Sequence, residues 1–481
     1  MNLAVLKNFM WRFAERCAAQ GVSFLITLVL ARLLDPDAYG KIALITVFIT
    51  ISNVFVNSGF GSALIQKKDA DDLDFSSVFY FNVFMCCVIY MIMFWGAIII
   101  AHYYKDMSLV PVIRVLSLTI VISGVKNIQQ AYVSRTMQFR NFFFSTLGGT
   151  IASAIIGVAL AYLGFGVWAL VAQQLSNQLV DTIILWLTVK WRPKRIFSIA
   201  RLGKLFSYGW KLLVSGLLDT IFGNMRQLIV GKLYTSSDLA YYNQGGRFPE
   251  FIIANVNSSI DSVLLPAMSK QQDNRHNVKT MTRKAIKTSV YVMAPLMMGL
   301  AFCGRTIICF LLTDKWLPCV PYLRIFCISY MFYPIHTANL NAIKAMGRSD
   351  LFLKLEIIKK IMALIILLAT VKYGIVAMTY SILLESFIAQ IINSWPNKRL
   401  LDYGYIEQLK DILPEIIMSV FMGICVGSIE VLKMSIPLTL LVQISLGIII
   451  YIGISIGLRF ETFFQLWESI KTMLGVLKKK V

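Results

Sequence analysis

A stripe of charged residues runs through residues 210–232, a stretch that is otherwise apolar and long enough to cross a bilayer. Lys211, Asp219 and Arg226 recur at helical spacing and therefore lie on one face of a helix. A charge at the centre of a bilayer costs about 2.5–3.5 kcal/mol, so this face should meet a helix bundle or a wet cavity. The two cations could bind an anion, and the carboxylate could titrate. Alternatively, the charges form buried ion pairs that only hold helices together.

The composition is that of a membrane protein. Of the 481 residues, 57% are hydrophobic and 15% are charged, whereas soluble domains have about 45–50% and about 25%. The net charge of +21 lies mainly in loops between apolar segments, where it indicates membrane topology rather than nucleic-acid binding. The sequence has no P-loop, HExxH, GxSxG or CxxC motif, so we expect no enzyme, no metal and no cofactor. We interpret the acidic residues at 69–72 as a solvated charge run.

Apolar windows of about 20 residues predict an all-α polytopic membrane protein with about fourteen transmembrane helices. The predicted spans are residues 9–34, 41–65, 76–102, 109–133, 142–164, 166–189, 207–232, 248–268, 285–311, 319–345, 351–371, 374–396, 410–432 and 436–458. The spans at 142–164 and 351–371 are nearly all apolar, so we expect them to face lipid.

Loop charges predict the orientation of the chain. Residues 190–204 carry six basic and no acidic residues, and residues 269–287 carry six basic and one acidic residue. The positive-inside rule places these loops, the N-terminus and the C-terminal tail in the cytoplasm. An even number of spans agrees with two cytoplasmic termini.

A weak internal repeat predicts two halves. Residues 31–40 match residues 231–240, and residues 166–169 match residues 374–377 at nearly the same offset. Since an even number of spans separates the matches, the halves should be parallel repeats related by an axis along the membrane normal. We therefore divide the chain into a six-helix half (1–189), a basic cytoplasmic linker (190–206), a second six-helix half (207–397) and two extra helices with a cytoplasmic tail (398–481).

Polar residues inside other spans extend the opening stripe, and their cations outnumber their acids. A cavity with surplus positive charge suits an anion such as phosphate. The candidate anion-binding residues are Arg12, Arg16, Lys126, Lys211, Arg226 and Lys344. Of these, Arg12, Lys211 and Lys344 could instead reach the cytoplasmic interface. The acids that could couple transport to an H⁺ or Na⁺ gradient are Glu15, Asp181, Asp219 and Glu385.

Helix-end motifs carry a family resemblance. Residues 31–40 (ARLLDPDAYG) and 57–66 (NSGFGSALIQ), with the second-half run 230–243, resemble the polysaccharide-transporter branch of the multidrug/oligosaccharidyl-lipid/polysaccharide flippase superfamily. Within this branch the chain is similar to Wzx-type flippases for lipopolysaccharide and capsule, especially colanic-acid exporters. The family often has an acidic residue where this chain has Asn57.

The resemblance implies a flippase of the bacterial inner membrane that works by alternating access of two helix bundles. Its cargo would be an undecaprenyl-pyrophosphate-linked oligosaccharide, moved from the cytoplasmic to the periplasmic leaflet for O-antigen, capsule or exopolysaccharide. The cations would neutralise the pyrophosphate, while sugar hydroxyls would meet Asn53, Asn57, Asn255 and Asn339. Its partners would be this substrate and membrane lipids. A polysaccharide polymerase and a chain-length regulator could be further partners.

Two other functions stay open at this point. A cation-coupled multidrug exporter on the same scaffold would need a cavity with surplus acid, whereas the spans here have surplus cation. A membrane polysaccharide polymerase or ligase would be expected to have a large external loop with clustered Arg or His, and no predicted outer loop reaches that size.

Overall fold

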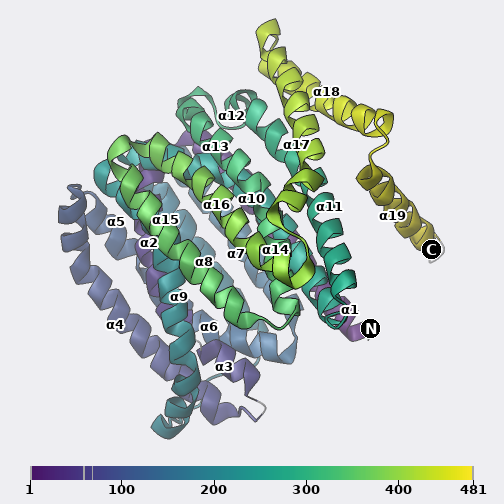
Figure 1. The fold of residues 1–481 in the computed structure, drawn as a ribbon. Coiled ribbons are helices and arrows are strands. Elements are labelled where there is room, and N and C mark those ends of the chain that lie inside the picture. The colour runs from purple at the N-terminus through teal and green to yellow at the C-terminus, as the bar shows by residue number, and fades with distance from the viewer. Residues whose placement is uncertain (1–2, 58–59, 68, 479–481) are drawn as a thin grey trace. The chain divides into compact units, whose positions relative to one another are not determined.

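The computed structural model describes residues 3–57, 60–67 and 69–478 (Figure 1). These residues are almost entirely α-helical, and none of them lies in a β-strand. Contacts along the chain divide it into two compact units, Met1–Ala240 and Tyr241–Val481. We call them unit 1 and unit 2 and describe each by itself.

Unit 1 consists of long helices joined by short turns, and its labels follow Figure 1. Its helices are α1 (Leu3–Leu33), α2 (Pro36–Asn57), α3 (Phe60–Gln66), α4 (Asp72–Tyr104), α5 (Leu109–Leu116), α6 (Leu118–Thr136), α7 (Phe139–Tyr162), α8 (Val167–Thr188) and α9 (Ile199–Leu233).

Unit 2 contains most of α10 and all later helices of the chain. Its α-helices are α10 (Ser236–Ser269), α11 (Arg275–Phe302), α12 (Gly304–Leu311), α13 (Val320–Met331), α14 (Tyr333–Ala345), α15 (Ser349–Thr370), α16 (Ile375–Leu401), α17 (Tyr405–Ser428), α18 (Ile436–Gly457) and α19 (Glu461–Lys478). Three short 3₁₀ turns lie between them: η1 (Asp314–Cys319), η2 (Val371–Tyr373) and η3 (Ile429–Leu432).

The outer faces of these helices are apolar, as expected for a protein in contact with lipid. On α4, for example, Ile92, Trp95 and Ile99 recur at helical spacing and are all more than 60% exposed. Eight helical segments among the described residues are long and apolar enough to cross a membrane. They are Pro36–Val56, Asp72–Tyr104, Leu109–Thr136, Phe139–Tyr162, Arg275–Phe302, Ile375–Leu401, Tyr405–Leu432 and Ile436–Gly457.

The prediction of an all-α, multi-pass membrane protein is therefore confirmed, while the count of about fourteen spans stays a prediction. Several predicted spans are two consecutive helices rather than one. The span at 109–133 is divided at Ser117 into α5 and α6, and the span at 319–345 is divided at Phe332 into α13 and α14. Pro334 at the start of α14 has no N–H to give to a continuous helix, which explains the second break.

The contact-based units and the predicted halves divide the chain at different places. The boundary between the units lies after Ala240 in the chain, so α9 belongs to unit 1. The predicted halves meet at residues 190–206 and are defined by sequence repeats, so this division stays a prediction.

A row of small residues lets α7 and α8 approach closely. Ser145, Gly149, Ser153 and Gly157 are buried at four-residue intervals along α7. A Cβ atom on Gly149 would lie 2.8 Å from the Asn177 carbonyl oxygen and 2.9 Å from the Asp181 Cβ. Small residues at this spacing are a common way to pack membrane helices backbone to backbone. The predicted lipid-facing span 142–164 therefore also carries a packing face.

Gly149→Ala is expected to destabilise the protein, although alanine is the better helix former by about 0.5–1 kcal/mol. The added methyl meets backbone on α8, and such overpacking costs about 1–3 kcal/mol. Gly96→Ala is the matched control, because a Cβ on this α4 glycine meets nothing within 4 Å. Thermal unfolding in detergent should show a lower midpoint for the first variant only. Equal midpoints would contradict the packing argument.

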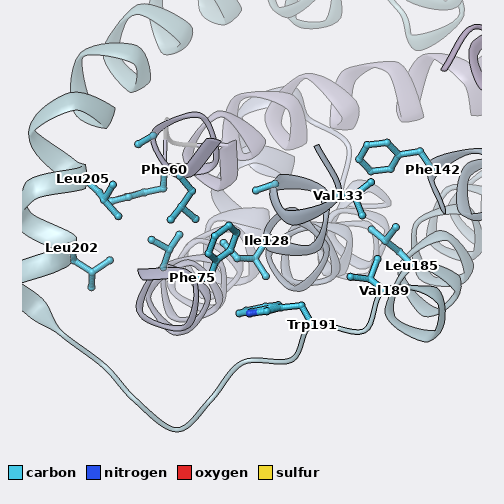
Figure 2. Close-up of a cluster of buried hydrophobic side chains, with 14 residues drawn as sticks. Phe60, Phe75, Ile128, Val133, Phe142, Leu185, Val189, Trp191, Leu202 and Leu205 are labelled. Carbon is cyan, nitrogen blue, oxygen red and sulfur yellow. The ribbon is translucent and has the colours of Figure 1, made fainter. Parts of the chain in front are cut away.

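The predicted linker 190–206 is part of unit 1 and packs against the start of α4. Figure 2 shows Trp191 among a buried apolar cluster with Phe75 and Ile128. The Trp191 indole N–H donates to Asp72 Oδ1 at 3.1 Å, and its ring lies 5.6 Å from the Phe75 ring, centroid to centroid. The backbone N–H groups of Lys194 and Ser198 donate to Ser76 and Ser77, each at 3.0 Å. The linker is thus bound along the first turns of α4.

The acidic residues at 69–72 belong to this junction. Asp71 caps α4 by accepting a hydrogen bond from the Asp74 N–H, and Asp72 pairs with Lys194 at 2.5 Å. The fully buried Asp74 pairs with Lys67 at 2.5 Å and with Arg201 at 3.3 Å. The Asp74 N–H, and after it the Arg201 charge, hold the pKa of Asp71 below its usual range. Asp71 and Asp72 remain part-exposed, but they act as anchors for the basic linker.

Candidate functional site

Unit 1 contains a buried ion pair between two predicted site residues. Lys126 on α6 and Asp181 on α8 lie 3.0 Å apart, and they are only 8% and 7% exposed. The Lys126 ammonium also donates to Gln178 Oε1 at 3.0 Å, and the Gln178 amide donates to Ser123. Lys126 was predicted to bind an anion and Asp181 to couple an ion. The structure brings the two together, so each satisfies the charge of the other.

Helix packing positions this pair. Gly149 on α7 allows α8 to approach at Asn177 and Asp181. On the other side, a Cβ on Gly124 of α6 would lie 2.5 Å from the Cys86 sulfur of α4. The pair is therefore fixed between tightly packed helices. Gln178, which completes its hydrogen bonds, was missed because it does not stand out from other polar residues of α8 in the sequence.

The opening stripe lies on α9, as predicted. Lys211 and Asp219 are exposed, and Arg226 is half-buried. Exposed charges on an otherwise apolar helix need a polar environment within a membrane, which is the condition that a wet cavity would meet. The roles predicted for these three residues stay predictions.

Four further predicted residues have side chains outside the described part of the structure. They are Arg12, Glu15 and Arg16, which belong to α1, and Asn57, the last residue of α2. Their predicted roles remain open.

Unit 2 contains a cavity of about 360 Å³ between α13, α14, α15 and α16, and its mainly apolar wall includes several charged side chains. It is lined by Glu385 of α16, a predicted coupling residue, and by Glu356, Lys359 and Lys360 of α15. Lys359 pairs with Glu356 one turn away at 2.6 Å. The cavity thus holds two carboxylates and two ammonium groups inside one unit.

His336 of α14 forms part of the same cavity wall and is 8% exposed. Its Nδ1 lies 3.2 Å from the Asn393 amide nitrogen of α16. The Asn393 amide can donate to Nδ1 when that ring nitrogen carries no proton.

The predicted span 351–371 was expected to face lipid, but one face of it lines the cavity instead. Glu356, Lys359 and Lys360 lie on the face of α15 that lines the cavity, whereas Ile361, Ile365 and Leu368 are more than 50% exposed. The charged residues of α15 all lie in its first twelve positions, and an uninterrupted apolar run follows them.

Asn339 of α14, a predicted sugar contact, lies in a buried amide network. Its Oδ1 accepts from the Asn397 amide of α16 at 2.6 Å and from the Gln408 amide of α17 at 2.9 Å. Its own amide donates to Gln408 Oε1 at 2.8 Å. All three side chains have no solvent exposure. The network therefore joins three helices of unit 2.

Asn339→Ala is expected to destabilise unit 2, because it leaves the Asn397 and Gln408 amides buried with fewer partners. Each unsatisfied buried group costs about 1–3 kcal/mol. Asn255→Ala is the control, since Asn255 is exposed and its amide bonds to the Phe251 carbonyl of its own helix. A thermal unfolding midpoint unchanged by Asn339→Ala would show that the network does not stabilise the unit.

The remaining predicted residues lie apart from these two polar sites. Asn53 of α2 is half-buried in unit 1. In unit 2, Lys344 is exposed at the end of α14, and its ammonium lies 4.4 Å from the centre of the Phe352 ring. A cation held on an aromatic face at a helix end is typical of a side chain that reaches the membrane interface.

Comparison with known proteins identifies related chains. A family model described as "Polysaccharide biosynthesis protein" matches residues 29–321, more than half of the chain. The teichuronic acid biosynthesis protein TuaB of Bacillus subtilis is 21% identical over 410 residues, which cover 83% of this chain and 84% of the relative. The lipopolysaccharide biosynthesis protein WzxC of Escherichia coli is 21% identical, and the match covers 78% of this chain and 76% of the relative.

Solved structures share the fold. The lipid II flippase MurJ in an inward closed conformation superposes with a TM-score of 0.75 at 16% identity, and the match covers 94% of this chain and 99% of that protein. An inward-facing multidrug resistance transporter of the MATE family, in the MOP superfamily, gives a TM-score of 0.62 at 14% identity over 81% and 98% of the two chains. At these identities the likeness concerns the fold alone.

Proposed function

Because the chain belongs to the polysaccharide biosynthesis protein family, we propose that it is a flippase that moves lipid-linked oligosaccharides across a membrane for a surface polysaccharide. The observation that carries this proposal is the placement of charged sites inside an apolar helical protein of this family. A protein that only crosses the membrane has no need of buried or cavity-lining charges, which are costly in lipid. Charges of this kind mark pathways for polar cargo or ions.

The detailed mechanism rests on the charges in the sequence and on the family resemblance, and it is part of the proposal. The protein has about fourteen spans and cytoplasmic termini in the bacterial inner membrane, and its two halves alternate in access. Arg226, Lys211 and the other predicted cations neutralise the pyrophosphate of an undecaprenyl-linked carrier, while asparagine side chains meet sugar hydroxyls. Lys126 contributes only if its pair with Asp181 opens, because that carboxylate already satisfies its charge. The protein makes and breaks no covalent bond, and it works beside a polymerase and a chain-length regulator.

Coupling to an H⁺ or Na⁺ gradient is assigned to the acids, and the described cavity favours Glu385 among them. Glu385 lines this cavity together with His336 and the Glu356–Lys359 pair. Asp181, in contrast, is bound by Lys126 at 3.0 Å. A carboxylate that exchanges its proton or a cation needs access to solvent, which the cavity provides and the buried pair does not.

The proposed function is tested in cells that lack the gene. Without the protein, oligosaccharides linked to the carrier lipid should accumulate on the cytoplasmic leaflet and surface polysaccharide should disappear, and both defects should be reversed by the intact gene. Carrier-linked oligosaccharides that still reach the outer leaflet but stay unpolymerised would instead indicate a polymerase. Normal polysaccharide together with new sensitivity to organic cations would indicate a multidrug exporter.

A further inference from the structure

A groove in unit 2 lies between the end of α10 and the start of α11 and has a volume of about 610 Å³. We call it the α10–α11 groove. The polarity of its lining residues changes along the two helices. Val263, Pro266 and Met281 form the part that lies within the helices, and Lys270, Gln271 and Asn277 form the part at the connecting loop. The groove is therefore apolar at one end and polar at the other.

The polar end presents hydrogen-bond donors. The Asn277 amide donates to Gln271 Oε1 at 2.9 Å, which leaves the Gln271 amide nitrogen as a donor for a ligand. Asn274 caps α11 by accepting from the Asn277 N–H, so the groove opens at the positive end of the helix dipole. Both features favour a negative group at this position.

The cations of this region fall into two sets. Lys279 and Arg283 face α17, where they pair with Glu407 at 3.4 Å and Asp411 at 2.5 Å. Lys270 and Lys284 are exposed, and in the described part of the chain no carboxylate lies within 4 Å of either ammonium group. Lys284 follows Asn277 and Met281 on the same helical stripe, which places it on the groove side of α11. The groove side thus carries two exposed lysines that have no carboxylate at ion-pair distance in the described part of the chain.

We propose that the α10–α11 groove binds an anionic phospholipid, with the phosphate at Lys270 and Gln271 and an acyl chain along Val263 and Met281. The apolar end favours a lipid over a soluble anion, since Val263 is 69% exposed and gains a cover when a chain lies on it. The surplus of lysine favours an anionic over a zwitterionic headgroup, because basic pockets between membrane helices attract negatively charged lipids. The bound lipid is a fixed part of the protein's surroundings and not its cargo, so this site is independent of the proposed function.

The test uses the purified full-length chain with phosphatidylglycerol and phosphatidylcholine, and lipid binding is measured by native mass spectrometry and by the shift in unfolding temperature. We expect phosphatidylglycerol to bind more tightly and to stabilise the protein more. Lys270→Ala should weaken this binding about five- to tenfold, as expected for one lysine near an anionic surface, whereas Lys270→Arg should keep it. Lys372→Ala is the matched control, because Lys372 is an exposed lysine in η2 and the charge change is the same.

Three results would overturn the proposal. Equal affinity for the two phospholipids would show annular contact without a headgroup site, and phosphatidylglycerol binding unaffected by Lys270→Ala would place the site elsewhere. Soluble pyrophosphate or a polyprenyl pyrophosphate that binds at Lys270 while phosphatidylglycerol does not would show a site for another ligand. Since Lys270 is exposed, its variants should fold, and their unfolding midpoints without added lipid check this directly.

Discussion

Asp181→Ala is expected to destabilise the protein more than the other single substitutions considered above. It removes one member of the buried Lys126–Asp181 pair and leaves the Lys126 ammonium without a counter-charge between α6 and α8. Breaking a buried ion pair in this way costs about 3–5 kcal/mol. The thermal unfolding midpoint in detergent should fall clearly, and less folded protein should be recovered from membranes.

The double variant Lys126→Met with Asp181→Leu is the control for this result. It replaces both charges by apolar groups, and buried ion pairs replaced in this way often lose no stability. Its unfolding midpoint should return close to that of the unchanged protein. If the single variant is as stable as the unchanged protein, the pair is hydrated or open in the membrane, and the structural role assigned to it is wrong.

Transport by the double variant then separates structure from function. If the pair only holds α6 and α8 together, the double variant should export polysaccharide normally. If Lys126 binds the anionic cargo or Asp181 exchanges an ion during the cycle, the double variant should fold and yet fail to export. Stability and transport together thus decide between the predicted roles and a purely structural one.

This pair also shows what the sequence could and could not predict. Polar stripes on apolar helices identified both residues as buried charges, because a charge inside a span needs a polar environment. Their pairing was not predictable, because it depends on how α6 and α8 pack and the two residues are 55 positions apart. The same holds for Asn339, whose partners Asn397 and Gln408 lie on two other helices.

The fold was predictable in class and less so in detail. Long apolar windows identified the helices, because each must satisfy its own backbone hydrogen bonds in lipid. The docking of the linker was not predicted, because a run of basic residues usually indicates a solvated loop. Only the structure shows that Trp191 is buried and that Lys194 pairs with Asp72. The cavity in unit 2 was missed for a related reason: of its charged residues only Glu385 was identified, while the charges of α15 were hidden in a mainly apolar segment.

Glu385→Gln is expected to reduce gradient-driven transport about tenfold or more, which corresponds to a barrier change of about 1.4 kcal/mol. Glutamine keeps the size and hydrogen bonding of the side chain but cannot exchange a proton or attract a cation. Because Glu385 is half-buried at the wall of a cavity, whereas Asp181 is almost fully buried, the variant should fold. The measurement is transport into everted membrane vesicles with and without an imposed H⁺ or Na⁺ gradient.

Glu356→Gln is the matched control, because it makes the same chemical change in the same cavity. Glu356 is bound to Lys359 of its own helix at 2.6 Å, which favours a structural role. It should therefore keep most of the transport and its dependence on the gradient. Loss of transport in both variants would assign coupling to the cavity as a whole. Normal, gradient-dependent transport by Glu385→Gln would remove Glu385 from the mechanism and return the search to Asp219 on α9, the exposed acid of the opening stripe.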